Sequence, residues 1–235
     1  PGTDRKAVDN VSLSITGGET VAIVGVNGSG KTTLAKLLCG LYTPDTGKIA
    51  IGGADSADTE PDTLYAKTSA VFQDYACYGG LTLRENVQIS DTAHPKDAEP
   101  FMRQAGCQDS LLDPEKMDTM MGRSFDGLEL SGGQWQRIAM ARGLYRDSDF
   151  ILLDEPTASI DPLEETRIYK MFASVAKEKT CVLITHRLGS ARIADRILVM
   201  DAGHLVESGT HEELLQKHGL YHEMWVSAAE QYVDA

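Results

Sequence analysis

Near its N-terminus the chain carries the stretch Gly25-Val26-Asn27-Gly28-Ser29-Gly30-Lys31-Thr32, followed by Thr33. The three glycines let the backbone turn tightly and aim successive N–H groups at one point, where the start of a following helix also favours negative charge. In such a loop the lysine reaches the β- and γ-phosphates of a nucleotide, and the next hydroxyl can coordinate Mg²⁺. The stretch therefore predicts a site for a magnesium nucleotide, with Lys31 counted among its catalytic residues.

The surroundings of this loop decide against an ordinary glycine-rich turn. Residues 21–24 are continuously apolar, as in a buried strand, and residues 31–41 place leucines at helical spacing. A phosphate-binding loop requires this order of strand, loop and helix. Upstream, residues 11–15 alternate between apolar and polar, which predicts a partly exposed strand before the buried one.

The remainder of the chain continues the alternation of strands and helices. Buried strands are indicated at 150–153, 182–185 and 197–200, and a helix at 164–177. Strands that alternate with helices predict a parallel sheet. The pattern of predicted secondary structure changes between residues 76 and 146, where prolines interrupt short helical patterns and no strand pattern is evident. We therefore expect an inserted helical subdomain there.

Composition excludes several classes of protein. The chain has 235 residues, 42% hydrophobic and 24% charged, which is typical of a globular protein. Its formal net charge of -13 disfavours nucleic acid as a partner. The four cysteines lie far apart in the sequence and form no C-x-x-C motif, so neither a zinc site nor a disulfide framework is indicated. The apolar runs are the length of strands and too short to cross a bilayer.

A pair of acids follows the apolar run at 150–153, namely Asp154 and Glu155. Parallel sheets bind ligands at the carboxyl ends of their strands, so these acids lie where chemistry is expected. Asp154 can hold Mg²⁺ through water, while Glu155 can polarise the water that attacks a γ-phosphate. The alternative is that both acids cap the turn before Pro156.

A second anion site is indicated by Leu130-Ser131-Gly132-Gly133-Gln134, which opens a helical pattern over 134–146. Ser131 is a suitable N-cap, and a helix start with two glycines exposes N–H donors and a positive dipole end. Taken alone, this pentapeptide would indicate only an ordinary capped helix at the surface.

These motifs together resemble the nucleotide-binding domain of ABC transporters over the whole chain, and Leu130–Gln134 matches the signature motif of that family residue for residue. The resemblance implies an α/β fold with a P-loop NTPase (RecA-like) core, an N-terminal antiparallel β-subdomain and an inserted α-helical subdomain. It implies a single domain over 1–235, with the helical signature subdomain at 76–146 and the rest at 1–75 and 147–235.

The resemblance also implies roles for residues that the chain's own patterns leave uninformative. Gln73 is similar to the glutamine that senses Mg²⁺ and the membrane domain, and His186 resembles the switch histidine that contacts the γ-phosphate. Asp161 resembles the aspartate that contacts a partner domain. Two such domains stack head to tail in the family, so each ATP lies between the phosphate loop of one and the signature, Ser131 to Gln134, of the other.

The exporter branch of the family is favoured by His186-Arg187-Leu188 and by residues 209–214. In exporters a transmembrane domain precedes this domain on the same polypeptide, which places it at the cytoplasmic face of the membrane. Arg123 stands where many exporters carry an acid that touches the membrane domain, which puts that coupling contact in doubt. The transported substrate is not indicated.

Two alternatives remain open. The first is an ATP-binding domain with a weak or regulatory ATPase role in a heterodimeric exporter, against which Glu155 and His186 argue. The second is the ATPase head of a DNA-repair or chromosome-structuring protein. Such a head should carry a long coiled-coil insertion and a surface compatible with DNA, whereas about a hundred residues separate the two motifs here and the charge is acidic.

Exporter domains commonly place an adenine-stacking tyrosine before a Pro-Gly such as Pro1-Gly2. Stacking on an aromatic ring contributes about 1–3 kcal/mol, so without that ring ATP binding is expected to weaken by about tenfold to a hundredfold. Titration of ATP against a chain with an aromatic residue added before Pro1 checks this expectation, and an unchanged dissociation constant would contradict it.

Overall fold

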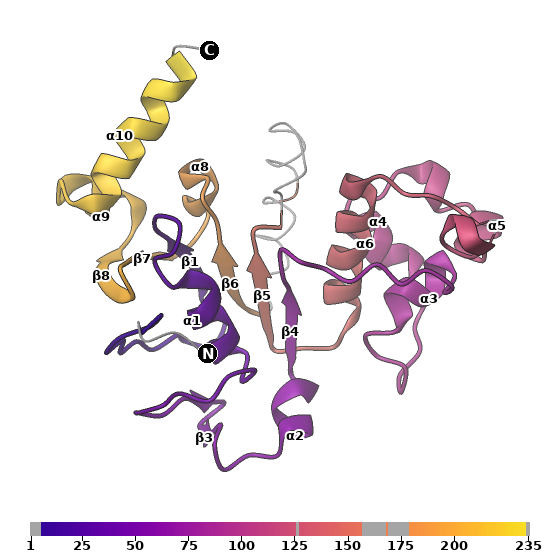
Figure 1. The fold of residues 1–235 in the computed structure, drawn as a ribbon, viewed down its shortest axis with the longest axis horizontal. Coiled ribbons are helices and arrows are strands. Elements are labelled where there is room, and N and C mark those ends of the chain that lie inside the picture. Colours follow the sequence, from indigo (N-terminus) through magenta and orange to yellow (C-terminus); the bar gives the residue numbers. More distant parts are fainter. Residues whose placement is uncertain (1–5, 126, 157–167, 169–178, 234–235) are drawn as a thin grey trace.

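The computed structural model describes residues 6–125, 127–156, 168 and 179–233 and is built around a six-stranded sheet (Figure 1). The strand order is β4-β5-β6-β1-β7-β8. The strands are β1 (Thr20–Val24), β4 (Thr68–Val71), β5 (Phe150–Asp154), β6 (Thr180–Ile184), β7 (Arg196–Asp201) and β8 (His204–Gly209).

The first five strands of this order run parallel, and β8 pairs antiparallel to β7. The register aligns Ile23 of β1 with Ile184 of β6, and Asp154 of β5 with the same Ile184. The carboxyl ends of β1, β5 and β6 therefore meet at one edge of the sheet. The predicted parallel sheet and its four buried strands are confirmed.

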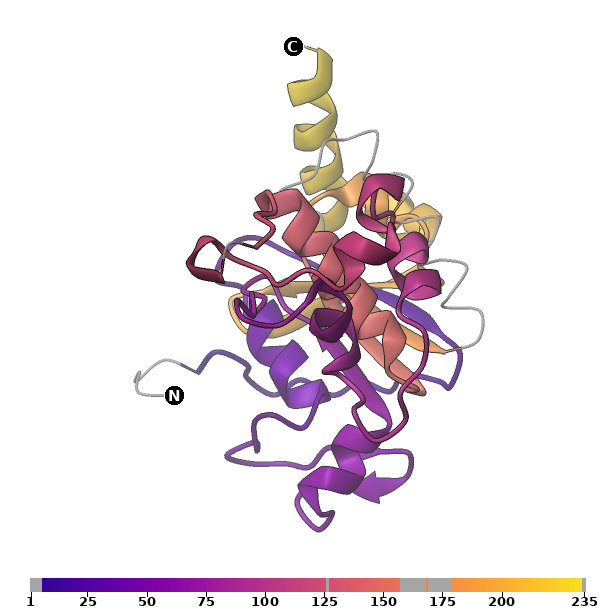
Figure 2. The same cartoon turned by 90° about the vertical axis from the view of Figure 1, so that its right-hand side faces the viewer.

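Both faces of β1 are covered, which explains its continuous apolar sequence. Val21 and Ile23 pack with Leu34 of α1 (Lys31–Leu38) on one face. Ala22 and Val24 pack on the other face, beneath the C-terminal helices. These helices are α8 (Leu188–Ala191), α9 (His211–Gln216) and α10 (Leu220–Val233), and α10 projects away from the sheet in both views (Figures 1 and 2).

A helical region lies beyond the β4 edge of the sheet and faces the viewer in Figure 2. It comprises α3 (Leu83–Gln88), α4 (Glu99–Gln104), α5 (Pro114–Met117) and α6 (Gly132–Tyr145), with the short 3₁₀ turns η1 (Asp109–Leu111) and η2 (Arg123–Phe125). The boundaries 76–146 for a separate subdomain remain a prediction, although the described residues in this range contain only helices, turns and isolated bridges.

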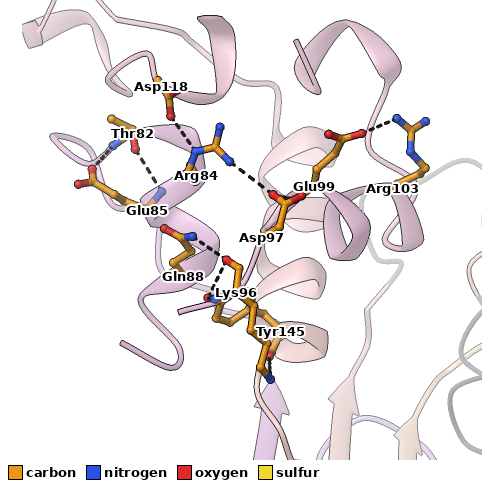
Figure 3. Close-up of polar contacts among 10 residues, drawn as sticks. All are labelled: Thr82, Arg84, Glu85, Gln88, Lys96, Asp97, Glu99, Arg103, Asp118 and Tyr145. Carbon is orange, nitrogen blue, oxygen red and sulfur yellow. Dashed lines mark hydrogen bonds and ion pairs between the residues drawn. The ribbon is translucent and has the colours of Figure 1, made fainter. Parts of the chain in front are cut away.

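Polar contacts connect these short helices (Figure 3). Arg84 of α3 pairs with Asp118 at 2.7 Å and with Asp97 at 3.5 Å. At the end of α6, the hydroxyl of Tyr145 donates a hydrogen bond to the carbonyl of Lys96 at 3.1 Å and accepts one from its N–H. Exposed ion pairs contribute at most about 1 kcal/mol each, so the buried residues around α6 account for most of the stability here.

The structure differs from the sequence expectations near the N-terminus. Residues 11–15 form no strand, although Val11, Leu13 and Ile15 do pack against the core on alternate positions. The alternation therefore predicted the burial of these side chains correctly, but no strand among the described residues pairs with this segment. Among the described residues before Gln73, antiparallel pairing is formed by β2 (Ala50–Ile51) and β3 (Ala54–Asp55), which precede α2 (Pro61–Ala66).

The two helices expected over 31–41 and 164–177 have different outcomes. The helix expected over 31–41 ends at Leu38, because Gly40 adopts a φ of +69° that a helix cannot continue. The helix expected over 164–177 lies outside the described residues, apart from Ile168, which is buried in the core.

Gly143 in α6 packs directly against β4, where the Oγ of Ser69 donates to its carbonyl oxygen at 2.7 Å. A Cβ added there would lie 2.6 Å from Cγ2 of Val71, whereas a Cβ at Gly189 in α8 would meet nothing within 4 Å. Gly143→Ala should therefore lower the free energy of unfolding by about 1–3 kcal/mol through overpacking, despite the better helix propensity of alanine. Urea denaturation measures the effect, with Gly189→Ala as the matched control; equal stabilities of the two variants would contradict the close contact.

Candidate functional site

The phosphate loop predicted at 25–32 connects β1 to α1 in a tightly constrained conformation. Gly25, Gly28 and Gly30 have φ values of +150°, +76° and +102°, which side chains rarely permit. A Cβ at Gly25 would lie 2.1 Å from the carbonyl oxygen of Met200, and one at Gly30 would lie 2.2 Å from that of Ala7. Glycine is therefore required at two of the three positions by contact as well as by conformation.

Lys31 is buried in this loop, with 5% of its surface exposed. Its Nζ donates hydrogen bonds to the carbonyl oxygens of Gly25 at 2.8 Å and Val26 at 3.0 Å. Burial lowers the pKa of Lys31, and the charges of Glu155 and Asp154 oppose that effect. The ammonium group is thus held inside the loop by carbonyl oxygens, close to both acids of the carboxylate pair.

Asp154 ends β5 with only 2% of its surface exposed. Burial raises the pKa of this carboxyl, while a hydrogen bond with the Thr32 side chain and the charge of Lys31 lower it. Among the described residues, its Oδ1 and the Oγ of Ser29 are buried side-chain oxygens that have no hydrogen-bond partner. Unpaired buried oxygens are costly, and oxygen ligands are those that Mg²⁺ prefers, so these residues fit a magnesium nucleotide.

Glu155 turns sharply away from β5. Its φ is +49°, an unusual value for a residue with a side chain, and its N–H donates to the carbonyl of Ile184 at 3.0 Å. The carboxylate forms an ion pair with Nε2 of His186, which directly follows Thr185 at the end of β6. Two of the three predicted catalytic residues, Glu155 and His186, are therefore in contact, which their sequence separation did not reveal.

The structure brings together the predicted residues that follow β1, β5 and β6, namely Lys31, Asp154, Glu155 and His186. Gln73 is exposed just beyond the end of β4, the neighbour of β5. Val26, Asn27, Gly28 and Thr32 are exposed, and Thr33 is half-buried in the first turn of α1. Asp161 lies outside the described residues, so its role remains a prediction.

The predicted signature lies on a different part of the molecule. Ser131 caps α6, because its Oγ accepts a hydrogen bond from the N–H of Gln134 at 3.3 Å and its own N–H donates to Gln134 Oε1 at 2.9 Å. Ser131 and Gly132 are exposed, and the first-turn N–H groups of Gly132 and Gly133 have no intrahelical acceptor. The N-cap prediction is confirmed, and the donors remain available to an anion.

The signature does not join the phosphate loop within one chain. Helix α6 packs against β4, and β5 and β6 lie between β4 and β1. Three strand spacings correspond to about 14 Å, and the first turn of α6 lies outside β4 (Figure 1).

Sequence reasoning missed the hydrogen bond by which Gly203 holds the phosphate loop. The carbonyl of Ser29 accepts a hydrogen bond from the N–H of Gly203 at 3.0 Å, and the carbonyl of Gly203 accepts one from the N–H of Asp9 at 2.8 Å. Gly203 lies in the turn between β7 and β8, with a φ of +88°. Only the Ala202-Gly203 turn pattern signals this residue, and no local pattern signals its contact with the loop.

The family described as ABC transporter matches residues 8–158, which include the phosphate loop, the signature and both acids. The chain belongs to the ABC transporter family. It is an ATP-binding, ATPase domain of that family with a P-loop NTPase fold, which confirms the family and fold expected from the sequence.

Individual relatives agree with this assignment. The chain is 40% identical to the subtilin transport ATP-binding protein of Bacillus subtilis over 229 residues, covering 95% of this chain and 37% of the relative. It is 39% identical to the nisin transport ATP-binding protein of Lactococcus lactis subsp. lactis, covering 100% of this chain and 39% of the relative. The ATPase domain thus spans less than two fifths of the length of these relatives.

A solved structure of a bacterial Atm1-family ABC exporter with ATP bound superposes with a TM-score of 0.88 at 36% sequence identity. The match covers 96% of this chain and 39% of that one. Among the residues described for this ATPase domain, no helix has both the length and the hydropathy needed to cross a membrane.

The cost of the buried Asp154 charge can be measured without nucleotide. Asp154→Asn removes the charge and should stabilise the nucleotide-free domain by about 1 kcal/mol at neutral pH, while abolishing the thermal stabilisation that Mg²⁺ and ATP give to the unmodified chain. Because burial raises the pKa of Asp154, acidification through that pKa protonates the group and relieves the cost.

The stability difference between Asp154→Asn and the unmodified chain should therefore shrink as the pH falls. Thermal melting at several pH values, with Asp149→Asn at an exposed position as control, follows this difference. A variant less stable than the unmodified chain at neutral pH would contradict the cost assigned to the charge.

Proposed function

We propose that this domain hydrolyses ATP at a head-to-tail interface with a second ABC ATPase domain, and that the hydrolysis powers export across a membrane by a transmembrane domain of the same polypeptide. The observation that carries the proposal is the group of Lys31, Asp154, Glu155 and His186 at one edge of the sheet, while the signature lies beyond β4. One chain supplies two half-sites that are separated in space.

The phosphate end of ATP fits the loop through Lys31 and the loop N–H groups. The Lys31 ammonium exchanges its contacts with the carbonyls of Gly25 and Val26 for phosphate oxygens. Thr32, Asp154 and Gln73 would hold Mg²⁺, which supplies charge neutralisation at the β- and γ-phosphates. The unpartnered Oδ1 of Asp154 supports this assignment.

Glu155 is the residue suited to accept a proton from the attacking water. It follows β5 directly, and its left-handed backbone directs the side chain to His186 rather than along the strand. The ion pair with His186 orients this carboxylate. His186 then contacts the γ-phosphate and keeps Glu155 aligned on the water.

A second chain is needed because α6 lies beyond the β4 edge, whereas the phosphate loop follows β1, three strands further into the sheet. The exposed, capped first turn of α6 offers N–H donors at a positive helix end, which suits the γ-phosphate of an ATP bound by another chain. Asp161 would contact that partner domain. The partner, whether identical or different, completes the site that this chain leaves open.

Export is supported by the names of the relatives, which include transport ATP-binding proteins for subtilin and nisin and an ATP-dependent lipid A-core flippase of Neisseria meningitidis. These cargoes differ chemically although the relatives match this chain at 38–40% identity. We therefore place cargo selection in the transmembrane domain, and this ATPase domain at the cytoplasmic face of the membrane, where ATP is supplied.

The role of Glu155 predicts a large loss of activity. Glu155→Gln should reduce steady-state phosphate release by about 10²- to 10⁴-fold, because the amide cannot accept the proton. ATP binding, measured separately by titration, should be retained. Glu99→Gln, at an exposed ion pair with Arg103, is the matched control and should leave turnover unchanged.

The two-chain site makes a separate prediction. Turnover per chain should rise with chain concentration as dimers form, since neither half-site is complete alone. Phosphate release measured over a wide range of chain concentrations checks this, and turnover independent of concentration would reject the composite site.

A further inference from the structure

The segment after Gln73 contacts the first turn of the signature helix through the hydroxyl of Tyr75. Tyr75 donates a hydrogen bond from its OH to the carbonyl oxygen of Gly132 at 2.8 Å. Gly132 is the first residue of α6 and a member of the signature. The Tyr75 ring packs against the core cluster around α6, so the hydroxyl extends from an anchored side chain rather than from a loosely held one.

A second attachment lies further along the same helix. Arg142 donates from Nη1 to the carbonyl of Ala76 at 3.0 Å, and its guanidinium lies 4.7 Å from the centre of the Tyr78 ring. Ten residues separate Gly132 from Arg142, which corresponds to about 15 Å of helix. Two attachments at this separation fix the direction of α6 relative to segment 75–78, as well as its position.

Other contacts of α6 are made with β4 and with the segment after α4. Its C-terminal end is held against β4, where Ser69 Oγ donates to the carbonyl of Gly143 at 2.7 Å. Its N-terminal half also contacts the segment after α4, where Gln134 Nε2 donates to Gln108 Oε1 at 3.5 Å. Among the described contacts of the first turn, the one from Tyr75 leads back toward Gln73 and the nucleotide edge of the sheet.

The partial burial of Tyr75 supports a fixed connection between Gln73 and Gly132. Tyr75 is half-buried, and burial raises the pKa of its phenol, so the hydroxyl remains a donor at physiological pH. Gln73 precedes Tyr75 by two residues, a distance of at most about 7 Å along the chain. In Figure 1 the segment leaves the end of β4 and runs past α6 toward α3.

We propose that Tyr75 is a positioning residue that ties the Gln73 segment to the signature turn. This inference rests on the two-chain site proposed above. Gln73 attends the ATP bound by its own chain, whereas Gly132 belongs to the turn that serves the ATP of the partner. A displacement of Gln73 on nucleotide binding then moves the signature turn through Tyr75, and the two sites of the dimer influence each other.

Tyr75→Phe tests the hydroxyl alone, because the ring and its packing remain. The matched control is Tyr78→Phe on the same segment, which keeps the ring beneath Arg142 and removes a hydroxyl that makes no hydrogen bond in the described contacts. If Tyr75 serves only as a packing residue, the two variants will behave alike.

The first measurement is amide hydrogen exchange of the chain without nucleotide. Tyr75→Phe should speed exchange in residues 132–136 by about two- to tenfold, as expected for the loss of one hydrogen bond, and leave residues 138–145 unchanged. Tyr78→Phe should change neither region. Unchanged exchange at 132–136, or equally faster exchange along the whole of α6, would overturn the positioning role without bearing on ATP hydrolysis.

The second measurement is phosphate release against chain concentration. In Tyr75→Phe the chain concentration at half-maximal turnover should rise about two- to tenfold, while turnover at saturating chain concentration stays within twofold of the unmodified chain. Tyr78→Phe should match the unmodified chain in both quantities. An unchanged half-maximal concentration in Tyr75→Phe overturns the link, even if local exchange is faster.

The unmodified chain separates this inference from the proposed function. If its turnover rises with chain concentration and Tyr75→Phe behaves identically, the two-chain site stands and the Tyr75 link is wrong. If its turnover does not depend on chain concentration, the two-chain site itself fails, and the link falls with it.

Discussion

The constraint on which this structure depends is the burial of opposite charges at the carboxyl edge of a sheet covered on both faces. Lys31 and Asp154 are almost fully enclosed, and burial disfavours the charged form of each. Their mutual attraction and the loop carbonyls around Nζ offset part of that cost. A buried charge with incomplete partners is costly unless a ligand completes the set, and Oδ1 of Asp154 is such a buried oxygen without a hydrogen-bond partner.

The parallel sheet places these groups, since three central strands end in register and each is followed at once by a functional residue. The ion pair between Glu155 and His186 joins the ends of β5 and β6, and the left-handed conformation of Glu155 is part of the same arrangement. The signature belongs to a helix outside this sheet edge. Hydrogen bonds from Tyr75 to Gly132 and from Arg142 to Ala76 connect this helix to the segment that follows β4.

Features encoded by short patterns could be predicted from the sequence. The buried strands, the phosphate loop and the Ser131 cap each depend on neighbours within a few residues, and all three are present. Long-range relations could not be derived in this way. Residues 11–15 have the alternation of a strand but pair with no strand in the described part of the chain. The hydrogen bond between Gly203 and the loop and the contact of Tyr75 with Gly132 join segments far apart in the chain.

The support of the phosphate loop also has a thermodynamic consequence. Gly25 and Gly30 fit so closely against the carbonyls of Met200 and Ala7 that the loop has little room for another shape, and Ser29 is fastened to Gly203. A phosphate loop that already has its binding conformation loses little conformational entropy when an anion binds. In the two-chain site proposed above, free energy from nucleotide contacts thus remains available for bringing the two domains together instead of being consumed in ordering the loop.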